Sequence, residues 1–229
     1  MSSNIHKTKE YFDANPTHFK HAVDEYPIMY REAAERINKH VKGNVLDIGS
    51  GGIINYETAK AKNVFLVDIT TANKERAGEK LIFINSDMRN LGIGNEKIDI
   101  VIMQHLLHHL ADNTLKKTLR NLEKGFKETQ RVVKKQGKIM IVEGCVPPAF
   151  DYLQRALFPL NKKLYKWLFS FPMVLQYSKE KIVRELKKAG FTIESVEVIK
   201  DGDVLPIFGL NLPRKYIPLK HYCIIAKKI

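Results

Sequence analysis

The sequence predicts an α/β fold in which helices cover both faces of a mostly parallel β-sheet. Five short apolar runs recur along the chain, and a long segment of helical periodicity separates the last two. Continuous apolar runs indicate strands that are buried on both faces, as in a parallel sheet between helices. A chain of 229 residues is long enough to bury such a core as one domain, so a single domain is expected.

The elements follow in order along the chain. Apolar residues at helical spacing predict an amphipathic helix over 25–40, and a second long helix is expected within 112–135, capped by Asp112-Asn113-Thr114. A third helix begins after Ser178 and ends at Gly190. The short segment 70–80 leaves room for a loop or a single turn. Residues 191–199 and 221–229 are strand candidates with no helix between them, so they should pair antiparallel at the sheet edge. The five apolar runs predict strands at 45–48, 63–70, 80–87, 97–105 and 137–144.

Composition limits the setting and the partners. Hydrophobic residues are 44% of the chain and charged residues 28%, the balance of a soluble globular protein. Two cysteines without CxxC spacing, an N-terminus without an apolar core and no run of 18 apolar residues predict a cytoplasmic protein. The net charge is +13, and residues 151–229 hold 15 basic and 7 acidic residues, a net of +8. This excess suits nucleic acid, an anionic membrane surface or an acidic substrate, but lysines that merely cover solvated faces explain it slightly better.

A glycine-rich turn follows the first strand, and the second strand ends in an acid. The glycines are Gly49, Gly51 and Gly52, and the acid is Asp68. Glycines let the backbone approach a ligand closely, and a carboxylate accepts hydrogen bonds from ribose hydroxyls. A dinucleotide fingerprint would need glycine at Ile54, and the lysine of a P-loop is absent. The pattern predicts a nucleotide-like ligand at the carboxyl ends of the strands.

With Asp47-Ile48-Gly49-Ser50-Gly51, the sequence resembles class I S-adenosylmethionine-dependent methyltransferases. Ile53 replaces the third glycine of that family's motif, although Gly52 stands beside it. The resemblance implies a Rossmann-like, mostly parallel seven-stranded sheet with an antiparallel edge strand, and S-adenosylhomocysteine as a product. It also implies that Asp68 binds the ribose hydroxyls, that Asp87 takes the adenine amine and that Met88 packs on the ring. The implied cofactor-binding residues are Asp47, Gly49, Ser50, Gly51, Asp68, Ile69, Asp87, Met88 and Gln104.

Three histidines, His105, His108 and His109, follow the fourth strand and are candidate general bases. The resemblance to phosphoethanolamine and ubiquinone-biosynthesis methyltransferases implies His109 as the base, with Tyr11 as its partner. His105 is a second catalytic candidate or a cofactor contact. Histidines here could equally pack or cap a helix. No cysteine or acid lies at ligand spacing near them, so no metal is expected.

The resemblance further implies a small, hydrophobic or aromatic substrate, with O-methylation favoured over C- or N-methylation. RNA methylation is the first alternative, but no Asn/Asp-Pro-Pro-aromatic signature follows strand four, and Cys145 ends strand five as a packing residue. A cyclase or binding module that holds the cofactor without methyl transfer is the second alternative.

The expected domain plan is a helical cap (1–42), a cofactor core (43–145), an aromatic and basic insertion (146–176), and a C-terminal helix with strands (177–229). The insertion is expected to be a substrate lid, with membrane contact as its alternative, and it contains Arg155, Phe158, Lys162, Lys163, Tyr165, Lys166, Trp167 and Phe169.

Overall fold

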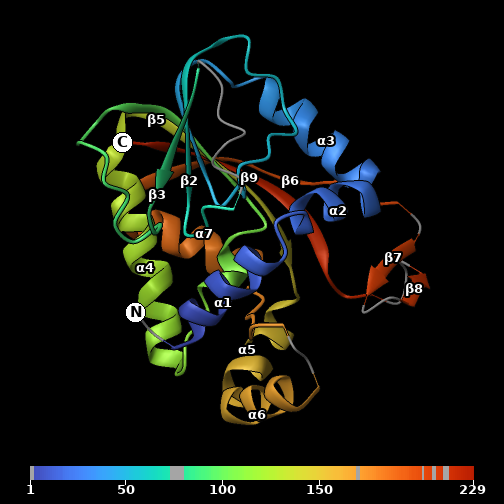
Figure 1. Ribbon diagram of the computed structural model, residues 1–229. Coiled ribbons are helices and arrows are strands. Elements are labelled where there is room, and N and C mark those ends of the chain that lie inside the picture. The colour runs from blue at the N-terminus through green and yellow to red at the C-terminus, as the bar shows by residue number, and fades with distance from the viewer. Residues whose placement is uncertain (1–2, 73–79, 169–170, 203, 208–209, 214–216) are drawn as a thin grey trace.

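The computed structural model describes residues 3–72, 80–168, 171–202, 204–207, 210–213 and 217–229. Its centre is a seven-stranded sheet with the strand order β3-β2-β1-β4-β5-β9-β6 (Figure 1). The apolar runs of the sequence form its first five strands, which confirms their predicted positions. The strands are β1 (Gly43–Ile48), β2 (Ala61–Asp68), β3 (Leu81–Asn85), β4 (Ile98–Gln104), β5 (Val133–Cys145), β6 (Phe191–Val198) and β9 (Lys220–Lys228).

The first five strands of the sheet pair in parallel, and only its far end is antiparallel. Strand β9 pairs antiparallel with β5 on one side and with β6 on the other, so it lies between them. The predicted antiparallel pairing of the last two strands is therefore confirmed, as is the fold class. The connection between β6 and β9 contains a small hairpin, β7 (Val204–Ile207) and β8 (Leu210–Pro213), which the sequence patterns did not predict.

Helices cover both faces of the sheet because the side chains of each strand alternate between two cores. In β5, Ile139 and Ile141 pack into one core, whereas Met140 and Val142 pack into the other. The first core lies under α4 (Leu115–Val132) and α7 (Lys179–Lys188), and the second lies under α3 (Pro27–Asn38) (Figure 1). This is the two-sided burial that the uninterrupted apolar runs predicted.

Local capping chemistry sets the starts of these helices. The Thr114 hydroxyl accepts a hydrogen bond from the Lys117 N–H at the start of α4, and the Ser178 hydroxyl does the same for the Lys181 N–H in α7. Helix α3 begins at Pro27. The first N–H groups of a helix have no partner within the helix, so a proline, which has no N–H, costs no hydrogen bond at this position. All three helices fall within the ranges that the sequence predicts.

Two helical regions lie outside the layers formed by the seven-stranded sheet and its covering helices. Helices α1 (Ser3–Ala14) and α2 (His18–Glu25) cross the carboxyl ends of the strands, and α5 (Pro148–Ala156) and α6 (Phe158–Leu168) extend away from the sheet (Figure 1). Most of the segment 70–80, expected to be a loop or single turn, lies outside the described residues. No described helix combines the length and hydrophobicity that crossing a bilayer requires.

Candidate active site

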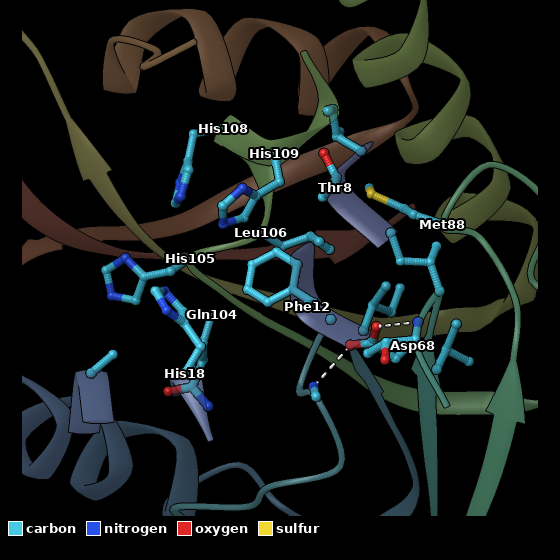
Figure 2. A pocket seen from close by; sticks show the side chains of 18 of the residues that line it. Thr8, Phe12, His18, Asp68, Met88, Gln104, His105, Leu106, His108 and His109 are labelled. Atoms are coloured by element: carbon cyan, nitrogen blue, oxygen red, sulfur yellow. Dashed lines mark hydrogen bonds between the residues drawn. The ribbon is translucent and has the colours of Figure 1, made fainter. Parts of the chain in front are cut away.

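A cavity of about 290 Å³ opens at the carboxyl ends of β1, β2 and β4, near the lower end of the size range of small-molecule sites. Ile48, Asp68 and Gln104 contribute to its wall from the ends of these strands, and Phe12 comes from α1. Figure 2 shows Asp68 and Met88 on one side of it and the histidines on the other, with Phe12 and Leu106 between them. Parallel strands place their ligand sites at this edge, so the cavity lies where the sequence predicted it.

The glycine turn brings bare backbone to the cavity. Gly49 adopts a φ of +80°, and a Cβ built on it would lie 2.6 Å from the Leu106 side chain. Gly51, with a φ of +58°, also lines the cavity. Any larger residue at position 49 would therefore suffer both backbone strain and a clash. This explains why the turn carries glycines, whose own N–H groups donate within the protein: Gly49 to the Val67 carbonyl at 2.8 Å and Gly51 to Asp68 at 2.8 Å.

Two residues of the same motif face away from the cavity. The buried carboxylate of Asp47 accepts a 2.8 Å hydrogen bond from the Tyr56 hydroxyl, and burial raises the pKa of Asp47 to about 7. The Ser50 hydroxyl accepts a hydrogen bond from the Gly52 N–H at 3.2 Å. Neither Asp47 nor Ser50 belongs to the described cavity lining. In this structure both support the turn from behind, so direct cofactor contact by either remains a sequence prediction.

Asp68 is the carboxylate best placed to meet a ligand. Its two oxygens accept hydrogen bonds from the Gly51 N–H at 2.8 Å and the Thr70 N–H at 2.9 Å, which fix the carboxylate at the end of β2. Burial raises its pKa, although these hydrogen bonds act in the opposite direction. Each oxygen keeps a further lone pair, and the carboxylate lines the cavity together with Ile69.

The end of β3 leads to a second acid that is already paired. Asp87 lines the cavity, but its carboxylate accepts hydrogen bonds from the Arg89 guanidinium, one of them from Nε at 2.8 Å. Met88 is almost fully buried beside it and offers an apolar surface. On the neighbouring wall, the Gln104 amide exchanges hydrogen bonds with Asn55 at 2.8 and 3.2 Å. Arg89 and Asn55 are therefore partners that the motif comparison missed.

This end of the cavity fits the adenosine part of S-adenosylmethionine. The glycine turn brings backbone without a side chain of its own to the cavity at Gly51, Asp68 offers fixed acceptors for two hydroxyls, and Met88 offers an apolar contact. These are the chemical types that a nucleoside needs. The roles assigned to individual residues from sequence nevertheless stay predictions.

Five histidines line the opposite end of the cavity: His18, His105, His108, His109 and His221. His105 has a left-handed backbone, with a φ of +51°, and its Nε2 lies 3.1 Å from the Met29 sulfur. Burial lowers the pKa of His105 to about 3. His105 is thus a neutral side chain with very little basicity, in an uncommon conformation that often marks functional sites.

His108 is within hydrogen-bond distance of a carboxylate, whereas His105 lies 3.9 Å from the same Glu143 oxygen. The His108 Nδ1 lies 2.8 Å from an oxygen of Glu143, a buried residue of β5 whose other oxygen accepts the Leu107 N–H at 2.9 Å. Burial alone would raise the pKa of Glu143, but His108 and the Leu107 N–H together hold it below its usual value. An ionised carboxylate accepts its hydrogen bond from Nδ1–H, so the neutral imidazole keeps Nε2 free as a proton acceptor.

His221 forms a second histidine–carboxylate pair. Its Nδ1 lies 2.7 Å from Asp201, and its ring stands 5.3 Å from that of His105. No sequence motif singled out these two residues. Strand β9 carries His221 and lies next to β5, which is what brings position 221 to the carboxyl end of the parallel strands.

His109, the predicted base, lines the histidine end of the cavity beside His108 (Figure 2). Burial lowers its pKa far below the usual range, and its Nδ1 has no hydrogen-bond partner among the described residues. The imidazole is therefore neutral, as expected from its apolar neighbours, but its basicity is low. Its assignment as the base remains a prediction.

Tyr11, the predicted partner of His109, lies outside the described lining. Its hydroxyl is 3.5 Å from Nδ1 of His18, and its ring packs edge-on against Phe171 at 4.7 Å. The structure brings Phe12 to His109 instead, at a ring distance of 5.2 Å. Within the described ranges, no three His, Cys, Asp or Glu side chains are grouped so that they could share a metal ion.

The insertion 146–176 has two kinds of aromatic residue. Phe158 is buried and Tyr165 packs against the first core, under α4 and α7, whereas Trp167 is 81% exposed. Phe169 lies outside the described residues. The described cavity lining includes no residue of this insertion, and α1 supplies Ile5, Thr8 and Phe12 on that side. A lid role for 146–176 stays a prediction.

Comparison with known proteins agrees with this geometry. Residues 46–141 match the family model described as a methyltransferase domain. No curated protein sequence matches the chain significantly. A chain from the complex between the Haloferax volcanii Trm112 methyltransferase activator and a methyltransferase is 14% identical with a TM-score of 0.69, and 96% of each chain is covered.

Two further solved structures are enzymes with bound cofactor product. Geranyl diphosphate C-methyltransferase from Streptomyces coelicolor is 11% identical with a TM-score of 0.65, covering 93% of this chain and 84% of that chain. The N-methyltransferase NodS from Bradyrhizobium japonicum is 11% identical with a TM-score of 0.64, covering 97% and 98%. These likenesses concern the fold.

The matched domain contains the glycine turn and the ends of β2, β3 and β4. It thus coincides with the part of the cavity that fits the cofactor. With this sheet order, the chain has the fold of class I S-adenosylmethionine-dependent methyltransferases, and its residues 46–141 match a methyltransferase domain.

Proposed function

We propose that this protein is an S-adenosylmethionine-dependent methyltransferase that methylates a hydroxyl oxygen of a small, mainly apolar molecule. The observation that carries the proposal is the pairing of His108 with Glu143 at the end of the cavity remote from Asp68. A hydroxyl must lose its proton as it becomes an ether, and a carboxylate-oriented imidazole is suited to take it. An amine or carbon acceptor would not account for this pair as directly.

The walls around the histidines indicate the character of the acceptor. Phe12, Met29, Leu106 and Leu110 line the cavity, and five imidazoles are among its polar groups. Apolar walls with a small number of placed polar groups favour a hydrophobic or aromatic molecule and disfavour a polyanion. RNA methylation therefore has no support from the cavity, although the net charge of +13 would suit it.

The proposed chemistry is a direct displacement. S-adenosylmethionine supplies an electrophilic methyl group on its sulfonium sulfur. His108 Nε2 accepts the hydroxyl proton while the oxygen forms its bond to the methyl carbon and the carbon–sulfur bond breaks, which leaves S-adenosylhomocysteine and a methyl ether. Glu143 holds the imidazole in the required tautomer and stabilises its protonated form. Alignment of the reactants contributes roughly 7–11 kcal/mol and the base about 10²–10⁴-fold.

His108 is favoured over His109 as the base for a physical reason. Both line the cavity, but only His108 has a carboxylate that compensates the charge it gains. His109 is buried next to other imidazoles, which lowers its pKa far below the usual range. A very weak base drives proton transfer poorly, so His109 serves better as a neutral group that positions the acceptor.

The test is a turnover screen that measures S-adenosylhomocysteine. The enzyme is incubated with S-adenosylmethionine and panels of phenols, enols, amines and bulk RNA. We expect product with apolar phenols or enols and mass spectra that show one added methyl on oxygen. Turnover with amines or RNA alone would reject the proposed acceptor. Cofactor binding without product from any panel would favour a cyclase or binding role.

A further inference from the structure

Exposed large apolar side chains concentrate in one part of the described chain. Eleven such residues are found in all, and seven of them lie between residues 150 and 167, on or between α5 and α6. Single exposed apolar residues are ordinary, but a concentration of this kind marks an interaction surface. We call it the α5–α6 surface, and it consists of Phe150, Tyr152, Leu153, Leu157, Leu160, Leu164 and Trp167.

The helical geometry aligns much of this surface. Leu160, Leu164 and Trp167 follow one another at positions i, i+4 and i+7 of α6, so they form a stripe on one side of the helix. Leu153 and Leu157 have the same spacing at the end of α5, and Asn161 donates its N–H to the Leu157 carbonyl across the junction. The apolar stripe thus continues from one helix into the next.

The charges around the surface are of one sign. Residues 148–168 contain four basic residues and one acid, Asp151. Asp151 is buried, where it accepts hydrogen bonds from Arg155 and from Ser178, so its charge is compensated inside the protein. Lys162 and Lys163 are exposed on α6 itself. An apolar stripe bordered by lysines, with a tryptophan at one end, is the pattern of a helix that lies in a membrane interface.

From these observations we propose that the α5–α6 surface docks on an anionic lipid bilayer. The apolar side chains would enter the headgroup region while the lysines contact acidic headgroups. A protein partner is a poorer match, because the surface combines a strongly exposed tryptophan and exposed leucines with a positively charged border. The inference does not depend on which acceptor atom is methylated.

The surface is connected to the cavity at its C-terminal end. Phe171, just beyond α6, packs at 5.7 Å from the His109 ring, and Leu175 donates its N–H to the His108 carbonyl at 3.1 Å. Asn4 of α1 also donates to the Met173 carbonyl. Docking would therefore bring the acceptor end of the cavity near the bilayer, where apolar molecules accumulate.

The only tryptophan of the chain provides a direct measurement. Trp167 fluorescence is recorded while the full-length protein is titrated with vesicles of phosphatidylcholine containing roughly 30% phosphatidylglycerol, and with phosphatidylcholine alone. We expect a blue shift and weaker acrylamide quenching with the anionic vesicles and little change with the neutral ones. Flotation of the same mixtures measures the bound fraction independently.

Matched variants separate the apolar and electrostatic contributions. Leu160→Ser with Leu164→Ser should lower the bound fraction at least about tenfold, and each of Lys162→Gln and Lys163→Gln should weaken binding about fivefold. The control is Val198→Ser with Ile229→Ser, two exposed apolar positions elsewhere, which should leave binding unchanged. Melting temperature and S-adenosylhomocysteine affinity are measured for every variant, so loss of folding is recognised.

Two results would overturn the proposal. One is an unchanged Trp167 spectrum and no flotation with anionic vesicles, while the protein still binds its cofactor. The other is a blue shift that depends on protein concentration without lipid, which would make the surface a contact between copies of the chain. Turnover with a water-soluble acceptor is tested separately, so failure here remains distinct from failure of the proposed methylation.

Discussion

The two ends of the cavity are built from different parts of the chain by different means. At one end, Asp68 is held by backbone N–H groups of adjoining turns, and the neighbouring surface is the glycine turn that follows β1. At the other end, His108 is held by Glu143 and His221 by Asp201, through side-chain pairs that link distant segments. The backbone-built end suits one fixed ligand. The end built from side-chain pairs can be altered by single substitutions, so it can suit different ligands.

This contrast indicates that the two ends of the cavity have different functions. The glycine turn leaves little freedom, because the backbone at Gly49 is left-handed and tightly packed against Leu106. The histidine end receives residues from α2, the end of β4 and β9. We infer that the cofactor end determines that methyl transfer occurs, and that the histidine end determines to which molecule. The following variants would sharpen or break this separation.

The largest effect is expected at the His108–Glu143 pair. His108→Gln should lower turnover by roughly 10²-fold or more while cofactor affinity stays near wild type, because only proton removal is affected. Glu143→Gln should lower kcat by a smaller factor, because the protonated imidazole loses its carboxylate. His109→Ala provides the comparison. If it lowers turnover more than His108→Gln does, His109 is the base.

A smaller effect, and on binding alone, is expected at Asp68. Asp68→Asn should weaken S-adenosylhomocysteine binding by about 1–3 kcal/mol, because ribose hydroxyls lose a charged acceptor in a buried site. Calorimetric titration measures the change, and Asp24→Asn on the exposed side of α2 is the matched control. Unchanged affinity would remove Asp68 from the cofactor site.

Asp47 should affect stability and its pH dependence. Burial raises the folded-state pKa of Asp47 from 3.8 to about 7. Its contribution to stability is therefore fully present below the unfolded pKa and is lost as the pH rises through the folded pKa. Wild-type stability should fall over this window by up to ~1.4 kcal/mol per pH unit from this group, and Asp47→Asn should abolish that slope.

Urea unfolding at several pH values between about 4 and about 8 measures the Asp47 effect. Tyr56→Phe is the companion variant, since it removes the hydrogen bond that the buried carboxylate accepts. It should destabilise the protein more above neutral pH than at acidic pH. A pH slope that survives in Asp47→Asn would show that another group causes it, whereas a large loss of cofactor affinity in that variant would show that Asp47 faces the ligand.

The smallest effect is expected at Tyr11. Its hydroxyl lies near His18 and outside the described cavity lining. Burial raises its pKa, so the phenol stays protonated and acts as no base near neutrality. Tyr11→Phe should change turnover by less than about twofold. A drop as large as that of His108→Gln would restore the catalytic role that the family resemblance implied for this residue.

Sequence patterns predicted which strand ends border the cavity, because residues that follow parallel strands must meet at one edge of the sheet. Asp68, Asp87 and Gln104 stand at corresponding positions after three apolar runs, and a parallel sheet brings such positions together. The same reasoning located the capped helices and the antiparallel strands. It could not show that Asp47 turns toward Tyr56 or that Asp87 is paired with Arg89, since side-chain direction depends on packing.

The histidine end was predicted only in part. The cluster 105–109 stands out in the sequence, but Glu143 is one acid among many in the sequence, and nothing local links it to His108. His221 and Asp201 lie in the last third of the chain and reach the cavity only through the placement of β9 beside β5. One signal was available: a glutamate within the apolar run 137–144 is costly to bury unless it has a partner.

The division between the two ends is tested most directly by one paired calorimetric experiment. S-adenosylhomocysteine is titrated into His108→Gln and Asp68→Asn, and the turnover of each variant is measured with saturating cofactor. We predict near wild-type affinity with turnover lowered about 10²-fold for His108→Gln, and weakened affinity with turnover largely restored at saturation for Asp68→Asn. Equal losses of affinity in both variants would contradict the separation of cofactor binding from acceptor chemistry.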